Sequence, residues 1–222
     1  MSRQLIHEHR FFLGIFALYL IVGAFGFLFY QQGDETLFFD RHHTSSRDHF
    51  FVFFTRLGEG GFLTLVAVVL LFTRLKYFFV YLIDISVVGI VIGFLKVQMF
   101  PDHVRPSLFF NGQYKLHFAE GIPVLTLYSF PSGHTAVAFA VFFLLAIYIK
   151  RTWVSMVLLC MALLVGLSRM YLMEHFWIDV YFGSLVGILI TLLVYIVLQK
   201  SMIHSDSKLL NLSLYERYLK RK

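Results

Sequence analysis

The chain has 222 residues, of which 59% are hydrophobic and 14% are charged, and its mean hydropathy is +0.75. This composition excludes a disordered chain and disfavours a soluble globular domain, in which about 25% of residues are charged. The net charge of +6 suits the orientation of a membrane protein rather than nucleic-acid binding, because cytoplasmic loops are enriched in Lys and Arg. The single cysteine, Cys160, excludes an intrachain disulfide.

Six apolar stretches predict an all-α, polytopic membrane protein with six transmembrane helices. The first could instead be a signal peptide, but it ends in Phe and Tyr rather than at a small-residue cleavage site, which favours an uncleaved anchor. The second is the weakest, because 14 residues also suit a buried helix. The third contains Asp84, for which we expect a buried polar contact. The stretches cover residues 11–30, 60–73, 77–95, 135–149, 152–168 and 180–198.

The Lys and Arg residues predict that both termini are cytoplasmic. With this orientation 12 of the 19 lie in inside segments and 7 in outside segments, as expected for cytoplasmic enrichment of positive charge. The pairs Arg74/Lys76 and Lys150/Arg151 occupy short inside turns. No internal repeat or linker marks a second domain, so we expect one membrane-embedded domain over residues 1–222.

The first outer loop, residues 31–59, mixes charged residues with phenylalanines. A helix that lies in the membrane interface has this composition, and we expect one here. The alternative is a partly ordered loop whose aromatic side chains lie at the membrane boundary.

Polar residues collect in two later segments. All four prolines lie between Pro101 and Pro131, and because proline breaks helices this is the long irregular outer loop. It contains Arg105 and ends at residues 131–134. Two predicted spans separate it from the second cluster, so both clusters face the same side of the membrane. The second cluster consists of Ser168, Arg169, Glu174, His175 and Asp179.

These residue types are suited to phosphoryl chemistry. His175 and Asp179 are four residues apart and would share one helix face, and a carboxylate beside a histidine fixes its tautomer, as in nucleophile and base arrangements. His134 follows Ser132-Gly133 at the start of a predicted helix, where backbone N–H groups and the positive helix end bind anions. Positive side chains that suit phosphate oxygens complete the set: Lys96, Arg105 and Arg169.

These motifs resemble those of the type-two phosphatidic acid phosphatase superfamily of integral membrane phosphatases. The family signature has three parts: Lys-x6-Arg-Pro, Pro-Ser-Gly-His and Ser-Arg-x5-His-x3-Asp. Residues 131–134 match the second part in full, and residues 168–179 match the third in full. The first part departs from the pattern, because eight residues separate Lys96 from Arg105 and the strict spacing would place the lysine at Gln98. Either Lys96 still reaches the site from a longer loop, which we favour, or this cation is missing.

The resemblance implies a phosphohistidine mechanism without a metal or other cofactor. His175 would be the nucleophile, Asp179 would orient it, and His134 would protonate the leaving oxygen. It implies a phosphorylated lipid as the substrate, such as undecaprenyl diphosphate, phosphatidylglycerophosphate, phosphatidic acid or a lipid A phosphate. Membrane lipids are the other expected partners, and no nucleic acid is expected. The phosphate-binding residues would be Lys96, Arg105, Ser132, Gly133 and Arg169.

We therefore expect a lipid phosphatase in the cytoplasmic membrane, with its active site on the extracytoplasmic side. A phosphotransferase that uses the same site is one alternative, and a six-helix transporter or lipid-binding protein without enzymatic activity is another. The residues also have simpler explanations: a structural His175–Asp179 pair, a capping His134 and an interfacial Arg169. The roles of Ser168 and Glu174 stay open. Solvated rather than metal-binding side chains are expected for the outer histidines His42, His43, His103 and His117.

Overall fold

The computed structural model describes residues 8–203 and 206–213, and throughout these residues the regular structure is helical. The segments 1–7 and 214–222, on which the predicted cytoplasmic termini depend, lie outside the described residues. The α-helices are α2 Arg10–Gly26, α3 Asp34–Arg41, α4 Ser45–Thr55, α5 Gly60–Thr73, α6 Leu75–Phe94, α7 Pro106–Phe109, α8 Gly133–Ile149, α9 Thr152–Tyr171 and α10 Trp177–Leu198. Shorter 3-10 and π-helical turns are η1 Arg56–Gly58, η2 Leu95–Met99 and η3 Gln199–Ile203.

A helix forms in each of the six predicted apolar stretches. Among the described residues, three continuous helices have the length and composition to cross a membrane: Leu75–Met99, Thr152–Tyr171 and Trp177–Leu198. A fourth crossing is possible where Ser45–Gly58 and Gly60–Thr73 join with a bend of 52°. The helices α2 and α8 are apolar but have only 17 residues each. The chain is thus a multi-pass membrane protein, whereas six complete spans stay a prediction.

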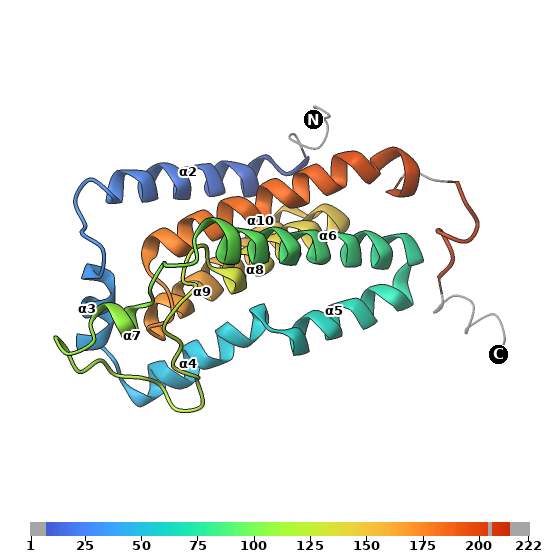
Figure 1. Ribbon diagram of the computed structural model, residues 1–222. Coiled ribbons are helices and arrows are strands. Elements are labelled where there is room, and N and C mark those ends of the chain that lie inside the picture. Colours follow the sequence, from blue (N-terminus) through green and yellow to red (C-terminus); the bar gives the residue numbers. More distant parts are fainter. Residues whose placement is uncertain (1–7, 204–205, 214–222) are drawn as a thin grey trace.

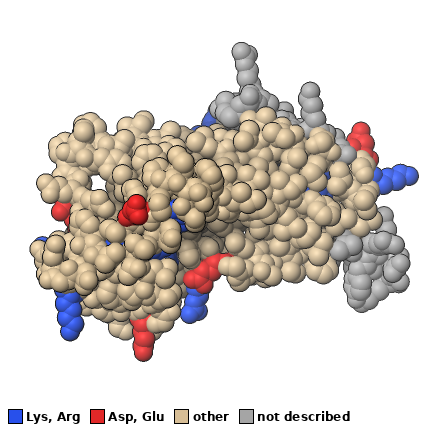
Figure 2. Space-filling view, in the orientation of Figure 1, with Lys and Arg blue, Asp and Glu red and all other residues tan. Residues whose placement is uncertain are grey.

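The helix α8 lies at the centre of the bundle and packs against α6, α9 and α10 (Figure 1). Its small residues alternate with aromatic ones that are completely buried, such as Phe139 and Phe143. Large apolar side chains on the outer helices are exposed instead, including Ile21 of α2 and Leu193 of α10. Figure 2 shows a broad surface with few charged side chains between the two charged ends of the molecule. Such a surface suits contact with lipid chains.

Two glycines allow α10 to approach the backbone of α8. A Cβ atom at Gly187 would lie 2.2 Å from the carbonyl oxygen of Ala136, and one at Gly183 would lie 2.6 Å from that of Ser132. Small residues permit such close contact between membrane helices. At the end of this contact the Ser132 N–H donates to the carbonyl oxygen of Asp179 over 2.9 Å. The contact therefore joins the Pro-Ser-Gly-His segment to the start of α10.

Asp84 of α6 makes the buried polar contact that its position predicts. Its side chain is completely buried, and the Thr191 hydroxyl of α10 donates to its Oδ2 over 3.0 Å. This contact lies within the helix bundle and joins α6 to α10.

We expect Gly187→Ala to lower the free energy of unfolding by about 1–3 kcal/mol, because the added methyl group overlaps the Ala136 carbonyl and pushes the helices apart. Thermal unfolding in detergent micelles measures the effect. Gly89→Ala in α6 is the matched control, since a Cβ there has no neighbour within 4 Å. Equal destabilisation by both substitutions would contradict the close contact of α8 and α10.

Candidate active site

The predicted site residues come together at one end of the bundle, where α3, α4, α7 and the long loop after η2 also lie (Figure 1). They come from η2, the start of α7, the start of α8, the end of α9, the turn that follows it and the start of α10. His134 and His175 interact electrostatically with each other, and both interact with the same three cations: Lys96, Arg105 and Arg169. The site thus assembles segments that are far apart in the sequence.

Asp179 and Ser129 orient the imidazole of His175. His175 is buried in the turn before α10, and its Nδ1 lies 3.3 Å from Asp179 Oδ2 and 3.3 Å from Ser129 Oγ. The same Asp179 oxygen accepts a short hydrogen bond from the Ser129 hydroxyl and a 2.9 Å hydrogen bond from the Phe176 N–H. With Nδ1 held by the carboxylate, the other ring nitrogen, Nε2, is left for the substrate. Ser129 was missed by the sequence analysis, because no motif contains it.

The environment of His175 favours its neutral form. Burial, followed by the positive charges of Arg105, Arg169 and Lys96, holds the pKa of His175 well below its ordinary value of 6.5. These effects outweigh the attraction of the proton by Asp179. These surroundings therefore favour the unprotonated ring that a nucleophilic nitrogen needs.

A buried carboxylate joins the two arginines of the site. Glu174 Oε2 lies 2.5 Å from Arg105 Nη1 and 3.1 Å from Arg169 Nη2. Arg105 also donates to the Glu174 carbonyl over 3.0 Å and to the Leu127 carbonyl over 2.9 Å. Burial raises the pKa of Glu174, while the positive charges of Arg169, Arg105 and Lys96 oppose this rise. The two arginines are thereby fixed beside His175.

Lys96 reaches the site in spite of its wider spacing from Arg105. It lies in η2, a five-residue π-helical turn, and such turns accommodate extra residues within a helix. Its Nζ donates to the carbonyl of Tyr128 over 2.5 Å and approaches the carbonyl of Ser129 at 3.5 Å. This places Lys96 against the segment that holds Asp179, while its role in binding phosphate stays a prediction.

The start of α8 is suited to bind an anion. Ser132 is the N-cap residue, and its Oγ accepts from the Thr135 hydroxyl over 2.9 Å and from the Thr135 N–H over 3.5 Å. Its own hydroxyl hydrogen can still be donated. The N–H groups of Gly133 and His134 lie in the first helical turn and have no carbonyl one turn earlier in the helix. Ser168, in contrast, donates to Val165 within α9 and takes no part in this cluster.

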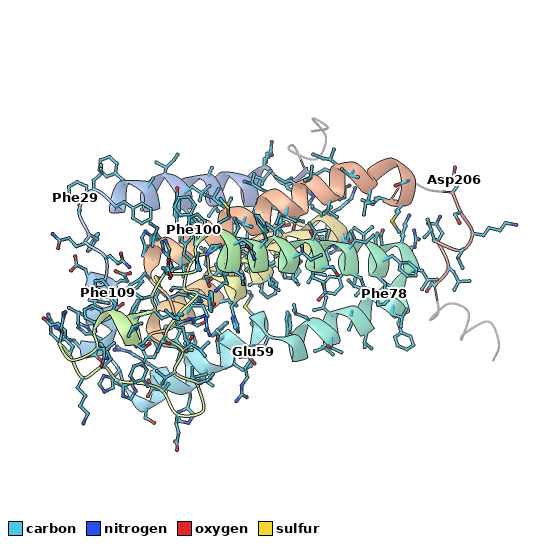
Figure 3. The ribbon with its side chains drawn as sticks, viewed as in Figure 1. Phe29, Glu59, Phe78, Phe100, Phe109 and Asp206 are labelled. Carbon is cyan, nitrogen blue, oxygen red and sulfur yellow. The ribbon has the colours of Figure 1, made fainter. Side chains whose placement is uncertain are left out.

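Residues 55–59, at the bend between α4 and α5, also border the site, and the sequence analysis missed them. The Thr55 hydroxyl accepts from Arg169 Nη1 over 2.5 Å. Gly58 packs against His134, since a Cβ at Gly58 would lie 3.1 Å from the His134 Cβ. Glu59 Oε1 lies 3.9 Å from His134 Nε2, and Figure 3 shows Glu59 at this bend. In the sequence, Gly58 beside the charged Glu59 at the end of the outer loop could have indicated this part of the site.

Within residues 8–203 and 206–213, no group of three His, Cys, Asp or Glu side chains is placed to hold a metal ion. His117 differs from the expected solvated state. Its Nε2 lies 2.9 Å from Asp48 Oδ2, and its ring stacks on His43 with the ring centres 3.9 Å apart. These contacts attach the long outer loop to α3 and α4, which explains why a histidine is held there.

We expect Glu174→Gln to lower the free energy of unfolding by about 3–5 kcal/mol, because it leaves two buried guanidinium groups without their counter-charge. Added inorganic phosphate should restore part of this loss, since a phosphate can replace the carboxylate between the arginines. Thermal unfolding with and without phosphate measures both effects. Glu120→Gln, on an exposed part of the outer loop, is the control, and equal stability of the two variants would contradict the assignment.

Comparisons with known proteins agree with these motifs. The chain is 40% identical over 95 residues to the bacitracin transport permease protein BcrC of Bacillus licheniformis, covering 42% of this chain and 43% of that protein. It is 32% identical over 139 residues to the undecaprenyl-diphosphatase of Sulfolobus acidocaldarius, covering 61% and 63%. The matches therefore span less than two thirds of the length of both relatives.

Two crystal structures have a similar fold. LpxE of Aquifex aeolicus has a TM-score of 0.65 and 25% identity, and the match covers 75% of this chain and 95% of that chain. A transmembrane PAP2-type phosphatidylglycerolphosphate phosphatase of Bacillus subtilis has a TM-score of 0.60 and 25% identity, covering 88% and 96%. The PAP2 superfamily profile matches residues 74–203, which include both histidine motifs and all three cations. The chain belongs to the PAP2 superfamily.

Proposed function

We propose that the protein is a lipid phosphatase that hydrolyses a phosphate monoester or diphosphate through a phosphohistidine intermediate. One observation carries the proposal: a buried His175 is held by Asp179 among three cations, which disfavour its protonation, at the end of a membrane helix bundle. The relatives support a phosphorylated lipid as the substrate, because two of them are named for lipid phosphates or diphosphates. A lipid would place its head group at the site and its chains beside the apolar helices.

The first step transfers the phosphoryl group to the enzyme. Lys96, Arg105 and Arg169, together with the Ser132 hydroxyl and the N–H of Gly133, hold the phosphate oxygens. The lone pair of His175 Nε2 attacks phosphorus, and the bond between phosphorus and the lipid oxygen breaks. That oxygen takes the proton of His134 and leaves as the lipid alcohol, or as a lipid monophosphate when the substrate is a diphosphate. Asp179 stabilises the positive charge that develops on His175.

The second step releases phosphate. A water molecule attacks phosphorus and gives a proton to His134, which became neutral in the first step. The bond between phosphorus and Nε2 breaks, and its electron pair returns to His175. Inorganic phosphate leaves, and both histidines regain their starting states. A phosphotransferase would use the same site with an acceptor hydroxyl in place of water, and analysis of the products with and without such acceptors distinguishes the two.

We further propose that residues 1–222 form one membrane-embedded domain with six spans, cytoplasmic termini and an extracytoplasmic site in the cytoplasmic membrane. The distribution of Lys and Arg supports this orientation. The 17 residues of α2 and of α8 extend about 25 Å, a little less than the hydrocarbon core of about 30 Å. The helices α3 and α4 of the first outer loop, which expose Phe38, Phe50 and Phe53, would lie in the interface.

We expect His175→Ala to abolish phosphate release from lipid phosphates, because the substitution removes the nitrogen that would take up the phosphoryl group. Wild-type protein exposed briefly to substrate with radiolabelled phosphate, then quenched without acid, should carry label on His175. A chelator should leave the rate unchanged, since the proposed mechanism uses no metal. Full activity or undiminished labelling in the variant would end this mechanism.

The orientation is tested by cysteine labelling in a Cys160→Ala background. We expect Asn111→Cys, in the long outer loop, to react with a membrane-impermeant maleimide in intact cells, because this loop lies on the proposed extracytoplasmic side. Arg151→Cys, in the turn between α8 and α9, is the matched exposed position on the other side and should react only after permeabilisation. The opposite pattern would place the site in the cytoplasm.

A further inference from the structure

Glu59 is the carboxylate next to His134. It occupies the N-cap position of α5, but its side chain makes no capping hydrogen bond. Its Oε1 lies 3.9 Å from His134 Nε2, which is too long for a hydrogen bond and close enough for a solvent-screened electrostatic interaction. Both side chains are partly exposed, 46% for Glu59 and 32% for His134. Glu59 thus stands at the opening of the site.

The backbone holds Glu59 in this position. Gly58 packs directly against His134, and a Cβ at Gly58 would lie 3.1 Å from the His134 Cβ and from its carbonyl oxygen. The preceding residues are held on the other side, because Thr55 accepts a hydrogen bond from Arg169. The bend of 52° between the helices before and after Glu59 turns the chain toward the site. The packing of the neighbouring residues therefore fixes the backbone from which the Glu59 side chain extends.

The groups that face His134 explain why a carboxylate is needed there. Burial, followed by the positive charges of Arg169 of α9, Arg105 before α7 and Lys96 of η2, lowers the pKa of His134 to about 3. His175 also interacts electrostatically with His134. Arg105 and Arg169 already share the carboxylate of Glu174, and Asp179 faces His175. Among the described residues, Glu59 is the one acidic side chain with an ion-pair contact to His134.

We propose that Glu59 is a positioning residue for the reaction, which favours the protonated form and the orientation of His134 that a general acid needs. This inference rests on the proposed function. Glu59 does not lose or gain a proton in the cycle. It offsets the charge of the imidazolium until His134 gives its proton to the lipid oxygen, as the bond between phosphorus and that oxygen breaks.

The experiment compares two phosphate esters that carry the same alkyl chain. Dodecyl phosphate releases an alkoxide, which must be protonated as it leaves. The phosphate monoester of a dinitrophenol that carries a dodecyl chain on its ring releases a stable phenoxide, which needs no proton. We expect Glu59→Gln to lower kcat for dodecyl phosphate about tenfold, which is part of the hundredfold or more that a general acid contributes. The KM should change little, and kcat for the dinitrophenyl ester should stay within about twofold.

A double-mutant cycle tests whether Glu59 acts through His134. In a His134→Gln background, Glu59→Gln should cause no further loss on dodecyl phosphate, since coupled residues are not additive. Glu59→Asp keeps the carboxylate and should restore part of the rate, while Glu120→Gln, a distant exposed carboxylate on the outer loop, should behave as wild type. An equal loss on both esters, wild-type activity, or additive losses with His134→Gln would overturn the inference.

Failure of the proposed phosphatase function and failure of the role of Glu59 give different results. No phosphate release by the wild-type protein from either ester, or full activity in His175→Ala, contradicts the proposed phosphatase function. The role of Glu59 alone is contradicted when the wild-type protein is active, His175→Ala is inactive, and Glu59→Gln affects both esters equally. Thermal unfolding of Glu59→Gln confirms that the variant is folded.

Discussion

The close contact between α10 and α8 is the constraint on which the rest of the site depends. Only glycine fits at positions 183 and 187, where a side chain would overlap the carbonyls of Ser132 and Ala136. Because the helices touch through their backbones, the Ser132 N–H reaches the Asp179 carbonyl. This one hydrogen bond joins the motif that contains His134 to the motif that contains His175. A wider helix separation would leave each histidine intact but would move the two motifs apart.

The second requirement is charge balance at a buried site. Isolated charges are costly to bury unless they are paired, and Arg105 and Arg169 are both almost completely buried. Glu174 pairs with both of them, so the arginines are held in place before a phosphate arrives. A phosphate carries more negative charge than the carboxylate and has several oxygens, so it can engage the cations that Glu174 leaves available. The two arginines can therefore be buried together, and their positive charge exceeds the single negative charge of Glu174.

The sequence predicted those features that depend on local patterns. The six helices form where apolar runs occur, and the His175–Asp179 contact appears at the predicted spacing of four residues. The sequence could not predict features that depend on contacts between distant parts of the chain. Ser129 and Glu174 are ordinary polar residues until folding brings them to Asp179 and to the two arginines. Lys96 lies in a π-helical turn, which no periodicity of side chains reveals.

The two histidines differ because their surroundings differ, although their side chains are chemically identical. His175 is sealed in a turn, where burial and three cations favour its neutral form and Asp179 fixes which nitrogen is free. His134 begins a helix at the opening, where part of its ring is exposed and the carboxylate of Glu59 is near. A reaction that needs one neutral imidazole and one charged imidazole at the same pH requires such an asymmetry. Burial and the same three cations also lower the pKa of His134, so the fold supplies only part of this asymmetry, through the greater exposure of His134 and the nearby carboxylate of Glu59.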